Sequence, residues 1–107
     1  MLNFKVVVTT SLGLLVALSA LAKDVVIDVR SEQEFQAGHV EGALNIPHTA
    51  IAQDILKTKV AKDDHVILYC QTGRRSGIAL ETLKGIGFSN AENYGGIDQA
   101  KKRLQKP

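Results

Sequence analysis

The sequence predicts a single α/β domain in which a mainly parallel sheet of about four to five strands is flanked by helices. Short apolar segments that resemble strands alternate along the chain with segments in which apolar residues recur at helical spacing. The central segment, 65–69, is almost entirely apolar, as expected for a strand that is covered on both faces. The 107 residues, of which 22% are charged and 45% hydrophobic, have the composition of one ordinary domain.

The first 22 residues are expected to be a secretory signal peptide. Lys5 provides a short basic region, 6–18 is largely apolar, and Ala20-Leu21-Ala22 has the pattern of a cleavage site. The apolar run is shorter than the roughly 20 residues that span a bilayer, which makes a retained membrane anchor the weaker alternative. We therefore expect residues 1–22 to be removed, and residues 23–107 to act in the periplasm without stable membrane association.

Two local signals define a short helix near the start of the domain. Ser31 and Glu34 match a capping box, in which the side chain of each residue pairs with the backbone N–H of the other. We therefore expect a helix at Glu32–Ala37 that ends at Gly38, because glycine readily adopts the backbone conformation that terminates helices. Phe35 is expected to anchor this helix in the core.

The remaining elements alternate between strands and helices. Strands are expected at Val25–Val29, Ala43–Ile46, His65–Tyr69 and Asn90–Tyr94. Helices are expected at about Thr49–Lys59, after the loop that follows the central strand, and at Ile97–Gln105. Buried faces are expected to include Ala50, Ile51, Ile55 and Leu56 in the first of these helices and Ala100 and Leu104 in the last. Gly95-Gly96 is expected to form a flexible turn.

The chain's only cysteine, Cys70, lies where the central strand ends and a helical pattern begins. The six residues after it are Gln71, Thr72, Gly73, Arg74, Arg75 and Ser76. A helix N-terminus exposes unpaired N–H groups, and a loop with glycine at its centre can turn those groups inward as an anion nest. Such a nest, with arginine nearby, can lower a thiol pKa from about 8.5 to roughly 3.5–7.5. We therefore interpret Cys70 as a nucleophile rather than a core cysteine, and the loop as its binding nest.

Several other kinds of chemistry are not indicated by the sequence. The basic residues are dispersed and the five aromatic residues form no stacking platform, so no nucleic-acid partner is expected. His39, His48 and His65 have no metal-ligand spacing, and a single cysteine cannot complete a zinc site. We expect a monomer that needs no metal or organic cofactor. Asp28 and Arg30 are interpreted as residues that form a structural pair or hydrogen-bond a neighbouring loop, rather than as catalytic residues.

The loop at 70–76, Cys-Gln-Thr-Gly-Arg-Arg-Ser, resembles the active-site loop of rhodanese-type sulfurtransferases. The segments 26–35, Val-Ile-Asp-Val-Arg-Ser-Glu-Gln-Glu-Phe, and 38–47, Gly-His-Val-Glu-Gly-Ala-Leu-Asn-Ile-Pro, resemble that family's other signature. The resemblance extends over about residues 25–100. It implies a rhodanese-like domain in which the Cys70 thiolate takes the outer sulfur of thiosulfate as a persulfide and passes it to cyanide or a thiol.

The resemblance also implies roles for neighbouring residues. It indicates that Arg75 holds the loop, that Arg74 meets the anionic substrate, and that His39 belongs to a fold signature and is not a general base. Two alternatives stay open, namely a non-catalytic rhodanese-like module that carries sulfur or binds protein, and a cysteine phosphatase. The phosphatase pattern is Cys-x5-Arg, whereas Cys70 and Arg75 form Cys-x4-Arg, and the shorter loop suits a sulfur atom better than a tetrahedral phosphate.

Overall fold

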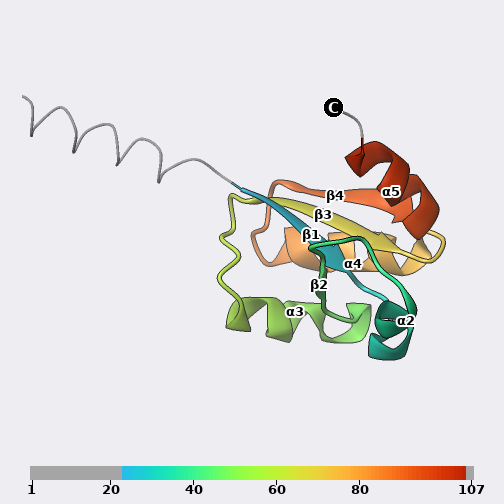
Figure 1. The fold of residues 1–107 in the computed structure, drawn as a ribbon. Coiled ribbons are helices and arrows are strands. Elements are labelled where there is room, and N and C mark those ends of the chain that lie inside the picture. The colour runs from blue at the N-terminus through green and yellow to red at the C-terminus, as the bar shows by residue number, and fades with distance from the viewer. Residues whose placement is uncertain (1–22, 106–107) are drawn as a thin grey trace, which may run out of the picture.

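A computed structural model describes residues 23–105, and the expected signal peptide lies outside these residues. The described residues form an α/β domain with a four-stranded sheet in the order β2-β1-β3-β4, in which every pairing is parallel (Figure 1). The strands are β1 (Asp24–Asp28), β2 (Leu44–Asn45), β3 (His65–Cys70) and β4 (Ala91–Gly96). The predicted fold class is thereby confirmed.

Helices cover both faces of the sheet. They are α2 (Glu32–Ala37), α3 (Ile51–Asp54), α4 (Arg74–Gly85) and α5 (Ile97–Leu104), with 3-10 turns at His48–Ala50 and Ile55–Lys57. In Figure 1, α5 lies on one face of the sheet, and α3 and α4 lie on the other. Side chains of a strand alternate between faces, so Leu68 and Cys70 pack in the core beneath α4, whereas Tyr69 packs beneath α5. Cys70 therefore points toward the face that α4 covers.

The pairing of β3 with β4 changes register just before Cys70. Leu68 is opposite Asn93, but Cys70 is opposite Gly96, so β4 contains one more residue than β3 over this interval. Such an extra residue bends a strand and re-aims its backbone. Gly95 lies in this interval with φ +89°, a left-handed conformation that glycine adopts most readily. The irregularity brings the end of β4 against the loop that follows Cys70.

Three expectations for individual residues are wrong. Gly95 and Gly96 are not a flexible turn, because they belong to β4 and Gly96 is buried against the Cys70 loop. Leu56 is 64% exposed, because the predicted long helix divides into short α and 3-10 segments, and the tighter 3-10 turn directs this side chain outward. Phe35 is only half-buried, because α2 lies beyond the main core, where its ring stacks on His39 at 3.6 Å between centroids. Ala100, in contrast, is buried as predicted.

Candidate active site

Cys70 is the last residue of β3, and its side chain is fully buried. The chain then turns through Gly73, which has φ +102° and forms the N-terminal cap of α4 without any side-chain hydrogen bond. This turn directs the Gly73 N–H back toward the cysteine, and it donates to Sγ over 2.9 Å. The sulfur therefore lies at the N-terminus of a helix, where unpaired N–H groups and the helix dipole favour a negative charge.

Ser76, in the first turn of α4, provides further hydrogen bonding to the sulfur. Its Oγ lies 3.4 Å from Sγ, and the serine is itself completely buried. Burial disfavours a charged thiolate, but hydrogen bonds from the Ser76 hydroxyl and from the backbone N–H groups of Ser76, Thr72 and Gly73 outweigh that effect, so the pKa of Cys70 is lowered. The loop thus favours ionisation of Cys70 mainly through hydrogen bonds.

Arg75 connects the beginning of α4 to α2. Its two terminal nitrogens donate to the two carboxylate oxygens of Glu34 over 2.7 and 3.0 Å, which is the bidentate arrangement that guanidinium groups favour. The Arg75 guanidinium, together with the Ser31 N–H, lowers the pKa of the Glu34 carboxyl to about 2. The charge of Arg75 also interacts with Cys70. This arginine therefore lies close enough to influence the thiolate while its own head group pairs with α2.

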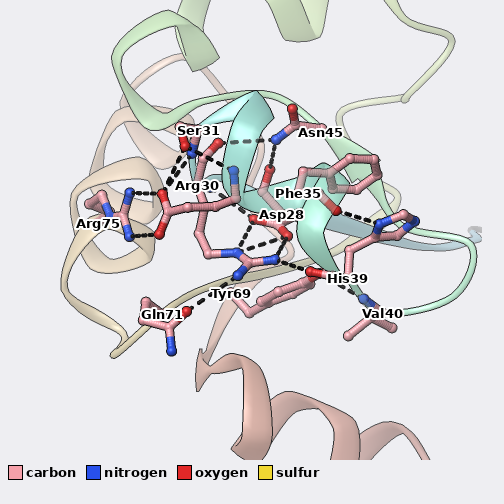
Figure 2. Close-up of polar contacts among 12 residues, drawn as sticks. Asp28, Arg30, Ser31, Phe35, His39, Val40, Asn45, Tyr69, Gln71 and Arg75 are labelled. Atoms are coloured by element: carbon pink, nitrogen blue, oxygen red, sulfur yellow. Dashed lines mark hydrogen bonds and ion pairs between the residues drawn. The ribbon is translucent and has the colours of Figure 1, made fainter.

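Arg30 contacts the same loop from the end of β1. Figure 2 shows its guanidinium between Asp28 and Gln71. It pairs with the buried Asp28 carboxylate at 2.7 Å, and donates to the Gly38 carbonyl at 2.6 Å and to Gln71 Oε1 at 3.2 Å. The interpretation of Asp28 and Arg30 as a structural pair is confirmed. The expected alternative, a hydrogen bond to a neighbouring loop, is present as well, and its partner Gln71 could not be named in advance because it lies 41 positions from Arg30 in the sequence.

Sequence reasoning missed two residues at the end of β4. Asn93 donates from Nδ2 to the Gly73 carbonyl over 3.0 Å, and its Oδ1 lies 2.7 Å from Ser76 Oγ. Gly96 lies so close to the loop that an added Cβ would lie 2.5 Å from the Gln71 carbonyl oxygen. The available signal was Asn-x-Gly-Gly in the strand that follows the helix after Cys70. Its meaning depends on which strand pairs with β3.

The structure divides the predicted loop residues into two groups. Gly73 and Ser76 lie against the sulfur of Cys70, whereas Gln71, Thr72 and Arg74 are exposed at the loop surface and Arg75 is turned toward α2. The Arg74 side chain makes no hydrogen bond or ion pair to any other residue in 23–105, so its cationic head is available at the loop surface. Within that same range, no group of three His, Cys, Asp or Glu residues is arranged to hold a metal ion. Nor does that range contain a helix that is both long and apolar enough to cross a membrane.

Comparisons with known proteins agree with this geometry. Residues 13–103 match the family model described as the Rhodanese-like domain. One relative is the thiosulfate sulfurtransferase PspE (phage shock protein E) of Escherichia coli, the protein that the segments 26–47 and 70–76 most resemble in our reading of the sequence. It is 39% identical over 87 residues, which cover 81% of this chain and 84% of that protein. A second relative is the thiosulfate:glutathione sulfurtransferase of Homo sapiens, which is 32% identical over 100 residues that cover 82% of this chain and 87% of that protein.

Solved structures show the same relationship. A structure described as a rhodanese with anions from Escherichia coli is 39% identical and superimposes with a TM-score of 0.68, covering 71% of this chain and 89% of that one. A human single-domain sulfurtransferase is 29% identical, with a TM-score of 0.62 and coverage of 92% of this chain and 94% of that one. The chain therefore belongs to the Rhodanese-like domain family.

Proposed function

We propose that this protein is a thiosulfate sulfurtransferase that moves a sulfane sulfur to cyanide or a thiol through a persulfide on Cys70. The observation that carries the proposal is that the buried thiol of Cys70, at the end of β3, faces the N-terminus of α4. The Gly73 nitrogen lies 2.9 Å from its sulfur and the Ser76 hydroxyl oxygen lies 3.4 Å from it. These donors favour a thiolate, which is the nucleophilic form of cysteine. The names of the relatives in Escherichia coli and Homo sapiens support thiosulfate as the donor.

In the first step, the Cys70 thiolate attacks the outer sulfur of thiosulfate. A new bond forms between Sγ and that sulfur, the S–S bond of thiosulfate breaks, and sulfite leaves with the electron pair. The persulfide then carries negative charge on its outer sulfur, and the N–H groups of the loop Gln71 to Ser76 would stabilise that charge. No proton has to be removed once the thiolate exists, so His39 and other potential bases are not required.

The two loop arginines have different parts in donor binding. Arg75 is paired with Glu34, which offsets much of its charge, whereas the Arg74 side chain is exposed and has no partner among residues 23–105. Arg74 is therefore the residue that attracts the dianionic donor from solution. Arg75 holds the start of α4 against α2 and adds a positive field near the sulfur. Because Cys70 is fully buried, only a small donor reaches it without displacing the loop.

In the second step, the acceptor attacks the outer sulfur of the persulfide and the Cys70 thiolate is regenerated. The bond between Sγ and the outer sulfur breaks, and its electron pair returns to Sγ, so neither step consumes an oxidant or a reductant. Cyanide yields thiocyanate, and a thiolate acceptor yields its persulfide. The human relative's name includes glutathione, which supports a thiol as acceptor.

Intact mass spectrometry tests this mechanism directly. Incubation with thiosulfate is expected to add one sulfur atom to the protein, and cyanide is expected to remove it. Cys70→Ser should show neither change, and protein alkylated beforehand with iodoacetamide is the matched control with an unaltered sequence. Thiosulfate:cyanide turnover by Cys70→Ser would refute the mechanism. Persistent absence of a persulfide on the folded protein would favour the non-catalytic module that binds protein instead.

We also propose export to the periplasm, with residues 1–22 as the cleaved leader. The proposal rests on the basic, apolar and Ala-x-Ala pattern of that segment. The family match begins at residue 13, inside the leader, so the position of the mature N-terminus is best measured directly. N-terminal sequencing of protein from the periplasmic fraction is expected to begin at Lys23. Recovery of the full-length chain in washed membranes would instead indicate an anchor.

A further inference from the structure

Asn93, near the end of β4, makes three hydrogen bonds, two of which go to the active-site loop. Its Nδ2 donates to the Gly73 carbonyl over 3.0 Å, and its Oδ1 accepts from the Ser76 hydroxyl over 2.7 Å and from the Gly95 N–H over 2.8 Å. Gly73 and Ser76 are also two of the residues that donate hydrogen bonds to the sulfur of Cys70. Asn93 therefore contacts two of the sulfur's donor residues without lying within hydrogen-bond distance of the sulfur itself.

The Ser76 hydroxyl has one proton and two acceptors within reach. Its Oγ lies 2.7 Å from Asn93 Oδ1 and 3.4 Å from Cys70 Sγ. A hydroxyl donates one hydrogen bond at a time, and a charged acceptor forms the stronger one. While Cys70 is a neutral thiol, the Ser76 hydroxyl donates its hydrogen bond to Asn93 Oδ1, which keeps the hydroxyl beside the sulfur. When the thiolate forms, the hydroxyl can turn to the sulfur, and Oδ1 keeps the Gly95 N–H as a partner.

We propose that Asn93 is a positioning residue for Cys70, holding Gly73 and Ser76 where the Gly73 N–H and the Ser76 hydroxyl can both donate to the sulfur. The contact with the Gly73 carbonyl restrains this residue from its C-terminal side, while the N–H on its other side points at the sulfur. The contact with Ser76 keeps the hydroxyl beside the thiol before ionisation. This inference deepens the proposed function, since a thiolate held in this way is the species that would accept sulfur.

The charged groups around the sulfur are independent of Asn93. They are Arg75 from α4 and the Glu34 carboxylate of α2 that pairs with it, Arg74 at the loop surface, and the Asp28–Arg30 pair, which contacts the loop at Gln71. The side chain of Asn93 hydrogen-bonds to none of these groups within the described part of the chain. Asn93→Ala therefore leaves the set of charges unchanged, and any effect on Cys70 ionisation reports the loss of hydrogen bonding.

The experiment is the pH dependence of Cys70 alkylation by iodoacetamide, in the wild type and in Asn93→Ala. Because Cys70 is the only cysteine, the modified fraction reports its thiolate directly. The variant is expected to have a higher thiol pKa, because the Gly73 N–H and the Ser76 hydroxyl are no longer held where they donate to the sulfur. At pH values below the wild-type thiol pKa it should be alkylated up to about tenfold more slowly, an effect comparable to the loss of one hydrogen bond to a charged group. At high pH, where the thiol is fully ionised, the two rates should converge.

Asn45→Ala is the matched control. Asn45 is also a half-buried asparagine whose Nδ2 donates to backbone carbonyls, those of Asp28 and Arg30, each over 3.0 Å. Its loss should lower stability in urea unfolding without moving the alkylation profile. If Asn93→Ala lowers stability in the same way and retains the wild-type alkylation profile, then Asn93 is merely structural and the proposal fails.

Two further variants separate the effect of the Asn93 contact with Ser76 from that of its contact with Gly73, and they keep the proposal testable if Asn93→Ala does not fold. Ser76→Ala should raise the thiol pKa. The double variant with Asn93→Ala should raise it by less than the sum of the two single effects, because the two residues share one hydrogen bond.

Asn93→Asp keeps the side-chain size but places a carboxylate oxygen against the Gly73 carbonyl, so it should raise the thiol pKa further than Asn93→Ala. A wild-type profile for Asn93→Asp would also overturn the proposal. Alkylation needs no sulfur donor, so a shifted profile without a persulfide would refute only the proposed function.

Discussion

Replacing Glu34 by glutamine tests how strongly α2 holds the active-site loop. The Glu34 carboxylate receives both terminal nitrogens of Arg75, at 2.7 and 3.0 Å, and also accepts from the Ser31 N–H at 3.1 Å. Glutamine has the same size and can still act in a capping box with Ser31. Glu34→Gln therefore removes the ion pair between α2 and α4 while it keeps most of the local contacts.

The magnitude of the effect follows from the pKa and the exposure of the pair. The pKa of Glu34 falls from 4.5 to about 2, chiefly through the hydrogen bonds from Arg75, and a change of this size is equivalent to at most about 3.4 kcal/mol. The side chains of Arg75 and Glu34 are 30% and 35% exposed, so solvent screens much of that interaction. The Ser31 contacts, which glutamine can replace, account for part of the remainder. We expect Glu34→Gln to lower the free energy of unfolding by about 1 kcal/mol at neutral pH.

The pH dependence identifies the charge as the cause. A carboxyl whose pKa is lowered on folding contributes stability that is present above its unfolded pKa, 4.5, and is lost as the pH falls through about 2. The difference between wild type and Glu34→Gln in urea unfolding should therefore be constant above pH 4.5, shrink below it, and disappear near pH 2. High salt should reduce the difference at neutral pH.

Glu32→Gln is the matched control for Glu34→Gln. Glu32 lies in the same first turn of α2 and is exposed, but it forms no ion pair within residues 23–105. Its replacement should cost only a few tenths of a kcal/mol, from the helix dipole. The reasoning is refuted if the two variants lose the same stability, or if the deficit of Glu34→Gln persists unchanged down to pH 2.

Three further predictions follow from other contacts. Gly96→Ala would place a Cβ 2.5 Å from the Gln71 carbonyl oxygen, so it should destabilise the fold by about 1–3 kcal/mol and slow persulfide formation, and unchanged urea unfolding would contradict the close approach. Glu92→Gln should lower the pKa of His65 in an NMR titration, because the Glu92 carboxylate is the largest cause of its raised value. Stability from the charged imidazole is present below 6.5 and lost as the pH rises through that raised pKa, so the variant's deficit should shrink in alkaline solution. A glycine inserted after Thr72 should weaken thiosulfate turnover and allow measurable phosphate binding or aryl phosphate hydrolysis, whereas efficient aryl phosphate hydrolysis by the unmodified protein would refute the argument from loop length.

The features that the sequence alone determined depend on residues close together in the chain. The Ser31 and Glu34 capping box is present as predicted, since its hydrogen bonds join residues three apart. The apolar run at 65–69 forms the central strand, because a strand covered on both faces has few polar positions. The Gly73 N–H faces Cys70 for a similar local reason, since a tight turn with glycine at its centre can direct its N–H groups inward.

Helix type and sheet pairing were decided only by the tertiary structure. The exposure of Leu56 depends on a division into 3-10 segments that hydrophobic spacing does not encode. Gly96 belongs to β4, which pairs with β3, and its backbone lies against the loop after Cys70. The need for a residue without a side chain at this position is therefore evident only once the strand order is known. The sequence shows only that Gly95 and Gly96 are glycines, which are common in turns. Their strand conformation follows from the pairing of β4 with β3.

The support around Cys70 likewise became visible only in three dimensions. Arg75 and Glu34 are 41 residues apart, and Asn93 and Gly73 are 20 apart, so no local pattern links them. The parallel sheet brings the ends of its strands to one edge, where residues from β1, β4 and α2 meet the loop. The sequence thus placed Cys70 beside a loop whose N–H groups face its sulfur, because that loop is built from adjacent residues. The fold determined which distant side chains hold that loop, because their hydrogen bonds form only after the strands have paired.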